Sequence, residues 1–289
     1  MSLLDVVILA VVQGLAELLP VSSSAHVVVA EKLMGLDPSS PSMTLLLVML
    51  HTGTMMAVIV YFFARWRSTY FQSMIAFKRF AWHVILATAL TGVIGEGLIV
   101  LIEKTAFRGS PHAEIEDLFS HLELIAPALA LAGMLIVAAD VLTRKQRDRP
   151  HSYNSDLNAG QAAVIGIVQG LSLPFRGFSR SGSTISAGML AGTARSRAES
   201  FSFALAVVLT PAVVGRELLR LIRDQQLNGM AAITTAVLPS LLGSILSFVA
   251  GLIALKWLSE WLENGRWYLF GIYCILAALS VAVLHHIGY

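Results

Sequence analysis

Long apolar segments are the feature that most limits what this chain can fold into. A helix needs about 20 consecutive, mostly apolar residues to cross the hydrocarbon layer of a bilayer. Charged residues make up only 13% of the sequence, against about 25% in soluble domains. The sequence therefore predicts an all-α integral membrane protein, a single polytopic membrane domain over residues 1–289. About six transmembrane helices are expected, at 43–64, 83–102, 122–143, 200–220, 232–256 and 267–287.

Two further apolar segments, 2–19 and 157–173, are marginal as spans. Each runs into a polar turn rich in serine, glycine and proline, and a short second apolar run follows, at 25–35 and at 184–193. Non-helical backbone at membrane depth is tolerated only where it is buried in protein or lines a wet cavity. We therefore expect two re-entrant helical hairpins, each of which turns at a polar tip and returns to its own side. Residues 65–82 mix basic and aromatic side chains, which is typical of an interfacial helix.

The two hairpin segments share a short motif. VQGL occurs at 12–15 and again at 168–171, and each copy leads through a proline into a serine-rich tip. This shared order predicts two repeats, about 1–143 and about 156–289, joined by a polar linker. Because the two hairpins would enter from opposite faces, the repeat has inverted topology. Inverted repeats built around broken helices place their binding site near the midplane, where the two halves meet.

The distribution of lysine and arginine predicts an orientation. With these segments, twelve basic side chains fall on the side of the first loop and six on the other side. The positive-inside rule then makes the richer side cytoplasmic, so both termini and the entrance of the first tip should face outward. The net charge of +2 and the lack of a long basic tract give no reason to expect a nucleic-acid partner.

The two tips carry polar side chains that are costly inside a membrane and usually functional there. In the first hairpin, Gln13 and Glu17 lie one helical turn apart on the same face. The remaining candidates are Ser22, Ser23, Ser24 and His26 in the first tip, and Arg176, Ser179, Arg180, Ser181, Gly182 and Thr184 in the second.

This set of side chains suits a phosphorylated ligand. Arginine offers a planar fork that fits phosphate oxygens, and hydroxyl and backbone N–H groups at the start of a short helix converge on an anion. A histidine can move a proton, and a serine beside it can attack. A carboxylate can share a hard divalent cation with phosphate oxygens. The collection predicts phosphoryl-transfer chemistry at membrane depth.

The stretches QGLAELLPVSSSAH and RGFSRSGSTI resemble the two signature motifs of the undecaprenyl-diphosphate phosphatases, the bacitracin-resistance phosphatases. The resemblance extends over the whole chain in length, motif separation and hydropathy pattern. It implies catalytic roles for Glu17, Ser23, His26 and Arg180, and binding of the diphosphate by Ser179, Ser181 and Thr184 together with Arg180. To these we add, as candidate diphosphate contacts, Ser22, Ser24, Gly182 and Arg176.

The same resemblance implies a need for Mg²⁺ or Ca²⁺, which we place at Glu17 and, more weakly, at Gln13. The implied substrate is a polyprenyl diphosphate in the bilayer, cleaved to the monophosphate and inorganic phosphate. That step regenerates the lipid carrier for peptidoglycan building blocks at the bacterial plasma membrane and gives resistance to bacitracin. We also expect that the chain can form a homodimer.

Two positions depart from the family pattern. The first acidic position is Gln13, so a metal site that relies on two carboxylates loses one. Arg176 stands in place of a proline, where it either contacts phosphate or faces the interface. The sequence does not separate Ser23, His26 and water as the nucleophile. It gives His51, in the middle of 43–64, equal weight as a packing residue and as a neighbour of the site.

The rival reading is a transporter. A flippase for a polyprenyl phosphate, or a transporter of another anion, could be built from the same inverted repeat, arginine and helix termini. Such a protein would not need a catalytic set, and the presence of Glu17, Ser23 and His26 favours the enzyme.

Overall fold

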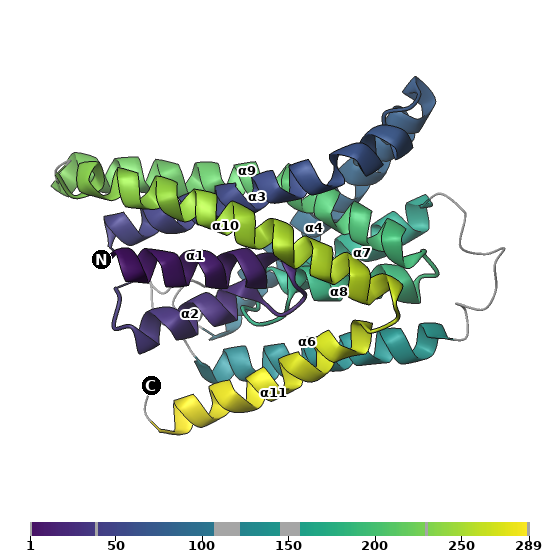
Figure 1. The fold of residues 1–289 in the computed structure, drawn as a ribbon. Coiled ribbons are helices and arrows are strands. Elements are labelled where there is room, and N and C mark those ends of the chain that lie inside the picture. The colour runs from purple at the N-terminus through teal and green to yellow at the C-terminus, as the bar shows by residue number, and fades with distance from the viewer. Residues whose placement is uncertain (1, 38–39, 107–121, 145–156, 229–230, 288–289) are drawn as a thin grey trace.

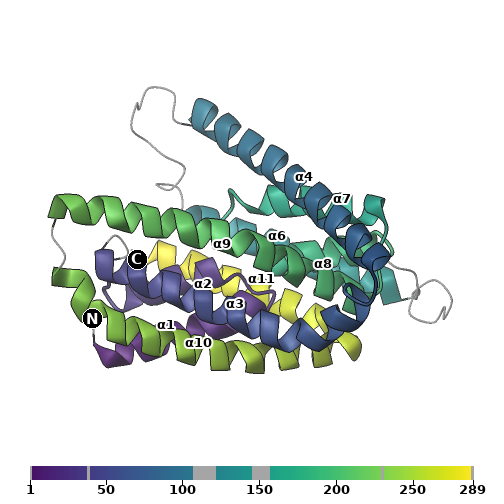
Figure 2. The same ribbon diagram turned by 90° about the horizontal axis from the view of Figure 1, so that it is seen from above.

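The structure, a computed structural model, describes residues 2–37, 40–106, 122–144, 157–228 and 231–287. In these residues the chain is helical, without β-strands. The helices run roughly alongside one another in an elongated bundle (Figure 1, Figure 2). Their bounds are α1 (Leu3–Leu18), α2 (Ser23–Leu33), α3 (Pro41–Thr69), α4 (Met74–Ala106), α6 (Leu122–Thr143), α7 (Ala159–Ser172), α8 (Arg180–Leu190), α9 (Arg195–Asn228), α10 (Ala231–Glu263) and α11 (Trp267–His286).

Among the described residues, five helices are long and apolar enough to cross a membrane: α3, α4, α6, α10 and α11. They cover five of the six predicted spans, and the protein is an all-α, multi-pass membrane protein. The sixth predicted span, 200–220, is helical within α9, but α9 is not among those five helices. Its first turns bury polar groups, including Glu199, Ser200 and Ser202.

The interfacial helix predicted over 65–82 is wrong. Residues 65–69 continue α3, and α4 begins at Met74. The break between them is stabilised by aromatic stacking, since the rings of Tyr70 and Phe80 lie 4.1 Å apart. Most of the predicted linker between the repeats lies outside the described residues.

Two helical hairpins stand where the sequence predicted them, α1–α2 and α7–α8. Helix α1 has 16 residues and α7 has 14, lengths of about 24 and 21 Å at 1.5 Å per residue. Both are shorter than the ~30 Å hydrocarbon layer. Figure 1 shows α1 starting at the end of the bundle that holds both termini and α7 starting at the opposite end. This reversed entry is what an inverted repeat requires; the repeat boundaries themselves stay a prediction.

Each hairpin is held by a glycine against a long helix from the other half of the chain. Gly14 of α1 lies so close to α10 that an added Cβ would be 2.6 Å from the Ala250 Cβ. Gly170 of α7 lies against α4 in the same way, where a Cβ would be 2.9 Å from the Ile94 Cβ. Gly14 and Gly170 are the third residues of the two VQGL motifs. The motif therefore marks a close helix crossing, made possible by the missing side chain.

A buried apolar core lies around the hairpin tips and fixes their positions. It includes Leu18 and Val21 of the first tip, Ile136 of α6 and Trp267 of α11. The indole nitrogen of Trp267 donates a hydrogen bond to Ser186 of α8, with a length of 3.1 Å. The second hairpin is thereby attached to both α6 and α11 through its returning helix.

Candidate active site

The centre of the site is the carboxylate of Glu17, on the last turn of α1. Arg180, the first residue of α8, donates from Nη2 to Glu17 Oε1 over 2.8 Å. Ser23, the first residue of α2, donates from Oγ to Glu17 Oε2 over 2.5 Å. Three helix ends, two from the first hairpin and one from the second, therefore meet at one carboxylate. The predicted pairing of the two tips is present in the structure.

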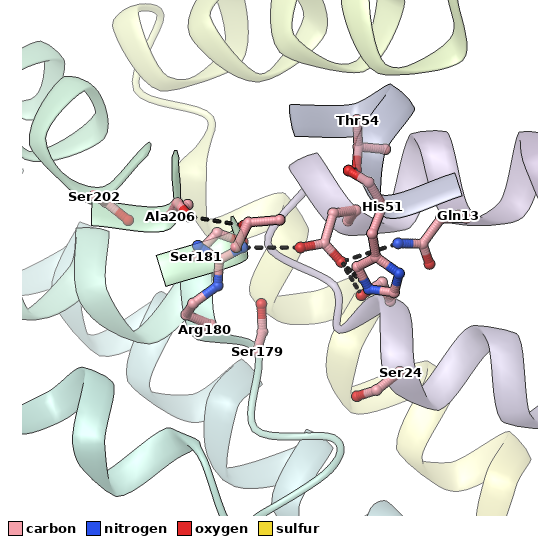
Figure 3. Close-up of polar contacts among 12 residues, drawn as sticks. Gln13, Ser24, His51, Thr54, Ser179, Arg180, Ser181, Ser202 and Ala206 are labelled. Carbon is pink, nitrogen blue, oxygen red and sulfur yellow. Dashed lines mark hydrogen bonds and ion pairs between the residues drawn. The ribbon is translucent and has the colours of Figure 1, made fainter. Parts of the chain in front are cut away.

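Two further side chains approach the same carboxylate. Gln13 Nε2 donates to Glu17 Oε2 at 3.3 Å, and His51 Nε2 of α3 lies 3.9 Å from that oxygen. Figure 3 shows Arg180 on one side of the site and Gln13 and His51 on the other. Sequence reasoning left His51 undecided, because a lone histidine in a long apolar helix carries no motif. The structure places it at the site.

The site opens into a small cavity lined by side chains of four elements. Glu17, His51, Thr54, Arg180 and Thr210 supply its polar wall, and its apolar lining is Leu18, Met55, Val58, Ala206 and Val207. Its volume is about 10 Å³, which is about the space of one water molecule. A diphosphate group can therefore enter only if neighbouring side chains move or exchange their partners.

The hydroxyl groups of the second tip are used within the protein. Ser179 caps α8 by accepting from the Gly182 N–H, and Ser181 donates to the backbone carbonyl of Leu19 in the first tip. Thr184 is fully buried and bonded to Ser202 of α9 at 2.6 Å. These contacts hold Arg180 at the helix start. None of the three hydroxyls lines the cavity, so the diphosphate contacts predicted for them stay predictions.

Gly182 fills a packing position. A Cβ at Gly182 would lie 2.8 Å from Ile136 of α6 and 3.2 Å from Pro20 of the first tip. The missing side chain lets the second tip pack closely against the first. In the structure Gly182 allows close packing between the two tips. Its role as a substrate contact stays a prediction.

The first tip has a strained turn. Ser22 is the only described non-glycine residue with a positive φ, at 68°, a conformation that costs of order 1–3 kcal/mol. Its hydroxyl lies 3.3 Å from that of Ser24, and neither hydroxyl contacts Glu17. The strained turn directs Ser23 back toward the end of α1, where its hydroxyl meets the carboxylate.

His26 lies apart from this centre. Its Nδ1 faces the Ser22 carbonyl at 2.8 Å, and its Nε2 faces the hydroxyl of Tyr273 in α11 at 2.7 Å. In the described part of the chain, His26 has no hydrogen bond to Glu17 or to Arg180. Sequence reasoning placed His26 beside Ser23 and missed Tyr273, since nothing in the sequence links residues 247 positions apart.

Arg176 is exposed and lies close enough to Glu31 of α2 for their charges to interact. It does not line the cavity at Glu17. Of the two alternatives for Arg176, phosphate contact or interface, its exposure fits the interface better. The phosphate contact stays a prediction.

The predicted divalent cation can be tested against the donor groups. The described residues form no cluster of three or more histidine, cysteine, aspartate and glutamate side chains, so they make no ready metal cage. Mg²⁺ is commonly held by one or two carboxylates together with substrate phosphate oxygens. Glu17 offers one carboxylate, and the carbonyl oxygen of Gln13 could face the same point after rotation of its amide. The donor set fits an ion shared with a phosphorylated substrate.

A larger cavity, of about 210 Å³, lies at the junction of α3, α4 and α9. Arg79, Arg197 and aromatic residues line it, and it contains none of the residues of the two tips. If volume alone were the criterion, this larger cavity would be the candidate active site. The ion pair at Glu17 joins the two sequence motifs, and we therefore place the candidate active site there.

Fold and site together define a multi-pass membrane protein with a carboxylate, an arginine and a serine joined inside the bundle by two helical hairpins. Residues 6–280 match the family described as "Bacitracin resistance protein BacA". The chain belongs to that family. It is 59% identical over 287 residues to a protein of Acinetobacter baylyi named Undecaprenyl-diphosphatase 2, covering 98% of each chain. It is 34% identical to Undecaprenyl-diphosphatase 2 of Burkholderia ambifaria and 35% identical to Undecaprenyl-diphosphatase 1 of Burkholderia pseudomallei, covering 96% of this chain and 95% of the relative in both cases.

Proposed function

We propose that this protein is a membrane phosphatase that cleaves undecaprenyl diphosphate, or a related polyprenyl diphosphate, to the monophosphate and inorganic phosphate. This step recycles the lipid carrier of peptidoglycan synthesis and supports resistance to bacitracin. The observation that carries the proposal is the contact of Arg180 and Ser23 with one carboxylate, in a chain whose full-length relatives are named undecaprenyl-diphosphatases.

Arg180 is the binding group for the diphosphate. Its guanidinium is paired with Glu17 at 2.8 Å, and the cavity beside it, of about 10 Å³, is too small for a phosphate. Binding therefore exchanges partners: the phosphate oxygens take the guanidinium, whose fork suits them, and Glu17 is released from the ion pair. The same arginine then stabilises the charge that develops during phosphoryl transfer.

Ser23 is the nucleophile that the geometry favours. Its hydroxyl already donates to Glu17 Oε2, so the carboxylate can take that proton as Oγ attacks the terminal phosphorus. The P–O bond to the bridging oxygen breaks, and the polyprenyl monophosphate leaves. Water then hydrolyses the phosphoserine and releases inorganic phosphate. Attack by water or by His26 is the alternative, and trapping of a phosphorylated residue distinguishes them.

A bound divalent cation would be held by Glu17 and the substrate oxygens, and would supply charge neutralisation of the diphosphate. We propose Mg²⁺ or Ca²⁺ for this role. We also propose that the protein lies in the bacterial plasma membrane with the site open to the outer side, supported by the excess of basic residues on the opposite side. The homodimer stays a prediction.

The first experiment measures phosphate release from a C55 or C15 prenyl diphosphate by the purified protein in detergent, with and without EDTA. We expect metal-dependent release that Arg180→Ala abolishes and Arg180→Lys, which keeps the charge without the fork, restores only in part. Thermal unfolding of each variant controls for folding. Release unaffected by Arg180→Ala would refute the site. No release from folded wild-type protein would refute the phosphatase and favour the transporter of polyprenyl phosphate.

A further inference from the structure

We infer that His51 is a ligand of the divalent cation at this site, binding it through Nε2 together with the carboxylate of Glu17. The inference deepens the proposed function and rests on it. It concerns a residue outside both signature motifs, in the middle of α3, which no motif of the sequence connects with the reaction.

The ring of His51 is already oriented for a ligand. Its Nδ1 lies 2.8 Å from the carbonyl oxygen of Leu47, one turn earlier in α3. A carbonyl only accepts hydrogen bonds, so Nδ1 carries the proton, and in the neutral ring Nε2 keeps its lone pair. Histidines that bind metals almost always donate their other N–H to a carbonyl or a carboxylate in this way. The backbone contact fixes both the tautomer and the direction of Nε2.

The lone pair faces the carboxylate across the cavity. His51 Nε2 lies 3.9 Å from Glu17 Oε2, which is too long for a hydrogen bond. Two ligands bound at right angles to one ion, with bonds of ~2.1 Å, lie about 3 Å apart. A movement of about 1 Å would bring the two atoms to that separation. Both side chains line the same cavity and reach it from different helices, α1 and α3, so an ion could enter between them.

Gln13, the neighbour of Glu17 on α1, leaves the cation site with a single carboxylate, and the imidazole of His51 supplies a further donor. Gln13 stands on the same face of α1 as Glu17 and contributes no negative charge. A site of one carboxylate, one amide and one imidazole is less suited to Ca²⁺, which prefers oxygen ligands, than a site with two carboxylates. Mn²⁺ takes the carboxylate and carbonyl oxygens that suit Mg²⁺ and, as a first-row transition metal, has more affinity than Ca²⁺ for an imidazole nitrogen. The donor set therefore predicts that Mn²⁺ binds at least as well as Mg²⁺ and better than Ca²⁺.

Mn²⁺ as a paramagnetic probe tests the assignment directly. Protein purified without a histidine tag is loaded with Mn²⁺ and measured by electron spin echo modulation, which detects ¹⁴N of a directly bound imidazole. We expect ¹⁴N coupling in the wild type and in His26→Gln. His51→Gln should lose the coupling and weaken Mn²⁺ binding at least about tenfold. The exposed His286→Gln is the matched control and should behave as the wild type.

Bound Mn²⁺ without ¹⁴N coupling, coupling retained in His51→Gln, or no binding of millimolar Mn²⁺ would each overturn the inference. Thermal unfolding of His51→Gln establishes that the variant is folded. Phosphate release is measured separately on the same samples. Coupling without any release would leave His51 as a ligand while refuting the phosphatase. Release without coupling would support the phosphatase and refute His51 as a ligand.

Discussion

The two hairpins share a plan and carry different chemistry. In both, the first helix contains VQGL, the chain then turns through a proline, and the returning helix starts directly after a serine, Ser22 or Ser179. Aligned on these serines, the first residue of the returning helix is Ser23 in one hairpin and Arg180 in the other. Four residues after the motif glutamine, the first hairpin has Glu17 and the second has Leu173.

Their surroundings differ as much as their residues. Every residue of α8 from Ser181 to Met189 is buried, and its hydroxyl groups are used within the protein. The returning helix of the first hairpin is less enclosed, and its Ser23 bonds to the reacting carboxylate. The second hairpin thus holds the guanidinium of Arg180 in a fixed position, and the first hairpin supplies the groups that can exchange a proton. The same local plan yields two roles because the side chains at equivalent positions differ.

The largest effect should come from removing the carboxylate that only the first hairpin has. We expect Glu17→Gln to lower kcat by about 10²- to 10⁴-fold, since it removes the proton acceptor while keeping the shape of the side chain. Steady-state phosphate release measures the effect. Leu173→Glu, which adds a carboxylate to the second hairpin at the position equivalent to Glu17, should not restore activity to Glu17→Gln. Restoration would contradict the division between the hairpins.

Within the first hairpin, replacing Ser23 should lower kcat much more than replacing His26. Ser23→Ala removes the hydroxyl at 2.5 Å from Glu17, and we expect at least about a 100-fold loss of kcat. His26→Ala removes a hydrogen bond to Tyr273. Such a bond contributes about 1 kcal/mol, so we expect kcat to fall by less than about tenfold. Tyr273→Phe should then reproduce His26→Ala. If His26→Ala instead abolishes release while Tyr273→Phe is active, the histidine acts on substrate directly.

The two motif glycines should prove equivalent. Leucine at Gly14 or Gly170 would collide with α10 or α4, and we expect each variant to lose about 1–3 kcal/mol of unfolding free energy. Gly92→Leu is the control, because a Cβ there meets nothing within 4 Å. Thermal unfolding in detergent compares the three. A Gly170→Leu variant as stable as the control would show that the two hairpins are not held alike.

The smallest expected difference concerns the serines that precede the returning helices. Ser179 accepts from the Gly182 N–H, whereas Ser22 makes no capping hydrogen bond. Ser179→Ala should therefore cost about 1 kcal/mol of stability. Ser22→Ala should change stability less, and Ser22→Gly should raise it slightly because glycine tolerates the positive φ of this position. Equal losses from the two alanine variants would contradict the difference in capping.

Much of this arrangement was predictable from the sequence, because apolar length and polar tips are local signals. The segments 43–64 and 267–287 became α3 and α11, and the two tips met through Glu17 and Arg180. The neighbours of His26 and Glu17 were not predictable in the same way. His51 and Tyr273 reach the tips from distant helices, and only the packing of those helices decides which side chain faces which tip.

The prediction of an interfacial helix over 65–82 was wrong for a related reason. Its basic and aromatic composition fits an interfacial helix, but composition does not show where one helix ends and the next begins. At the break after Thr69, the ring of Tyr70, the C-cap of α3, stacks on Phe80 of α4, a contact that composition does not reveal. Residues 200–220 show the limit of apolarity as a guide, since α9 buries serines and a glutamate against protein, where hydrogen bonds satisfy them.

The ion pair between Glu17 and Arg180 joins residues 163 positions apart, and this separation has a consequence for synthesis. The ribosome completes α1 long before it makes the arginine that neutralises the carboxylate. During that interval the first hairpin carries an uncompensated charge, and Gly14 has no α10 to pack against. The ion pair and the packing of Gly14 against α10 can form only after those later helices have been made, so the active centre is completed late in synthesis.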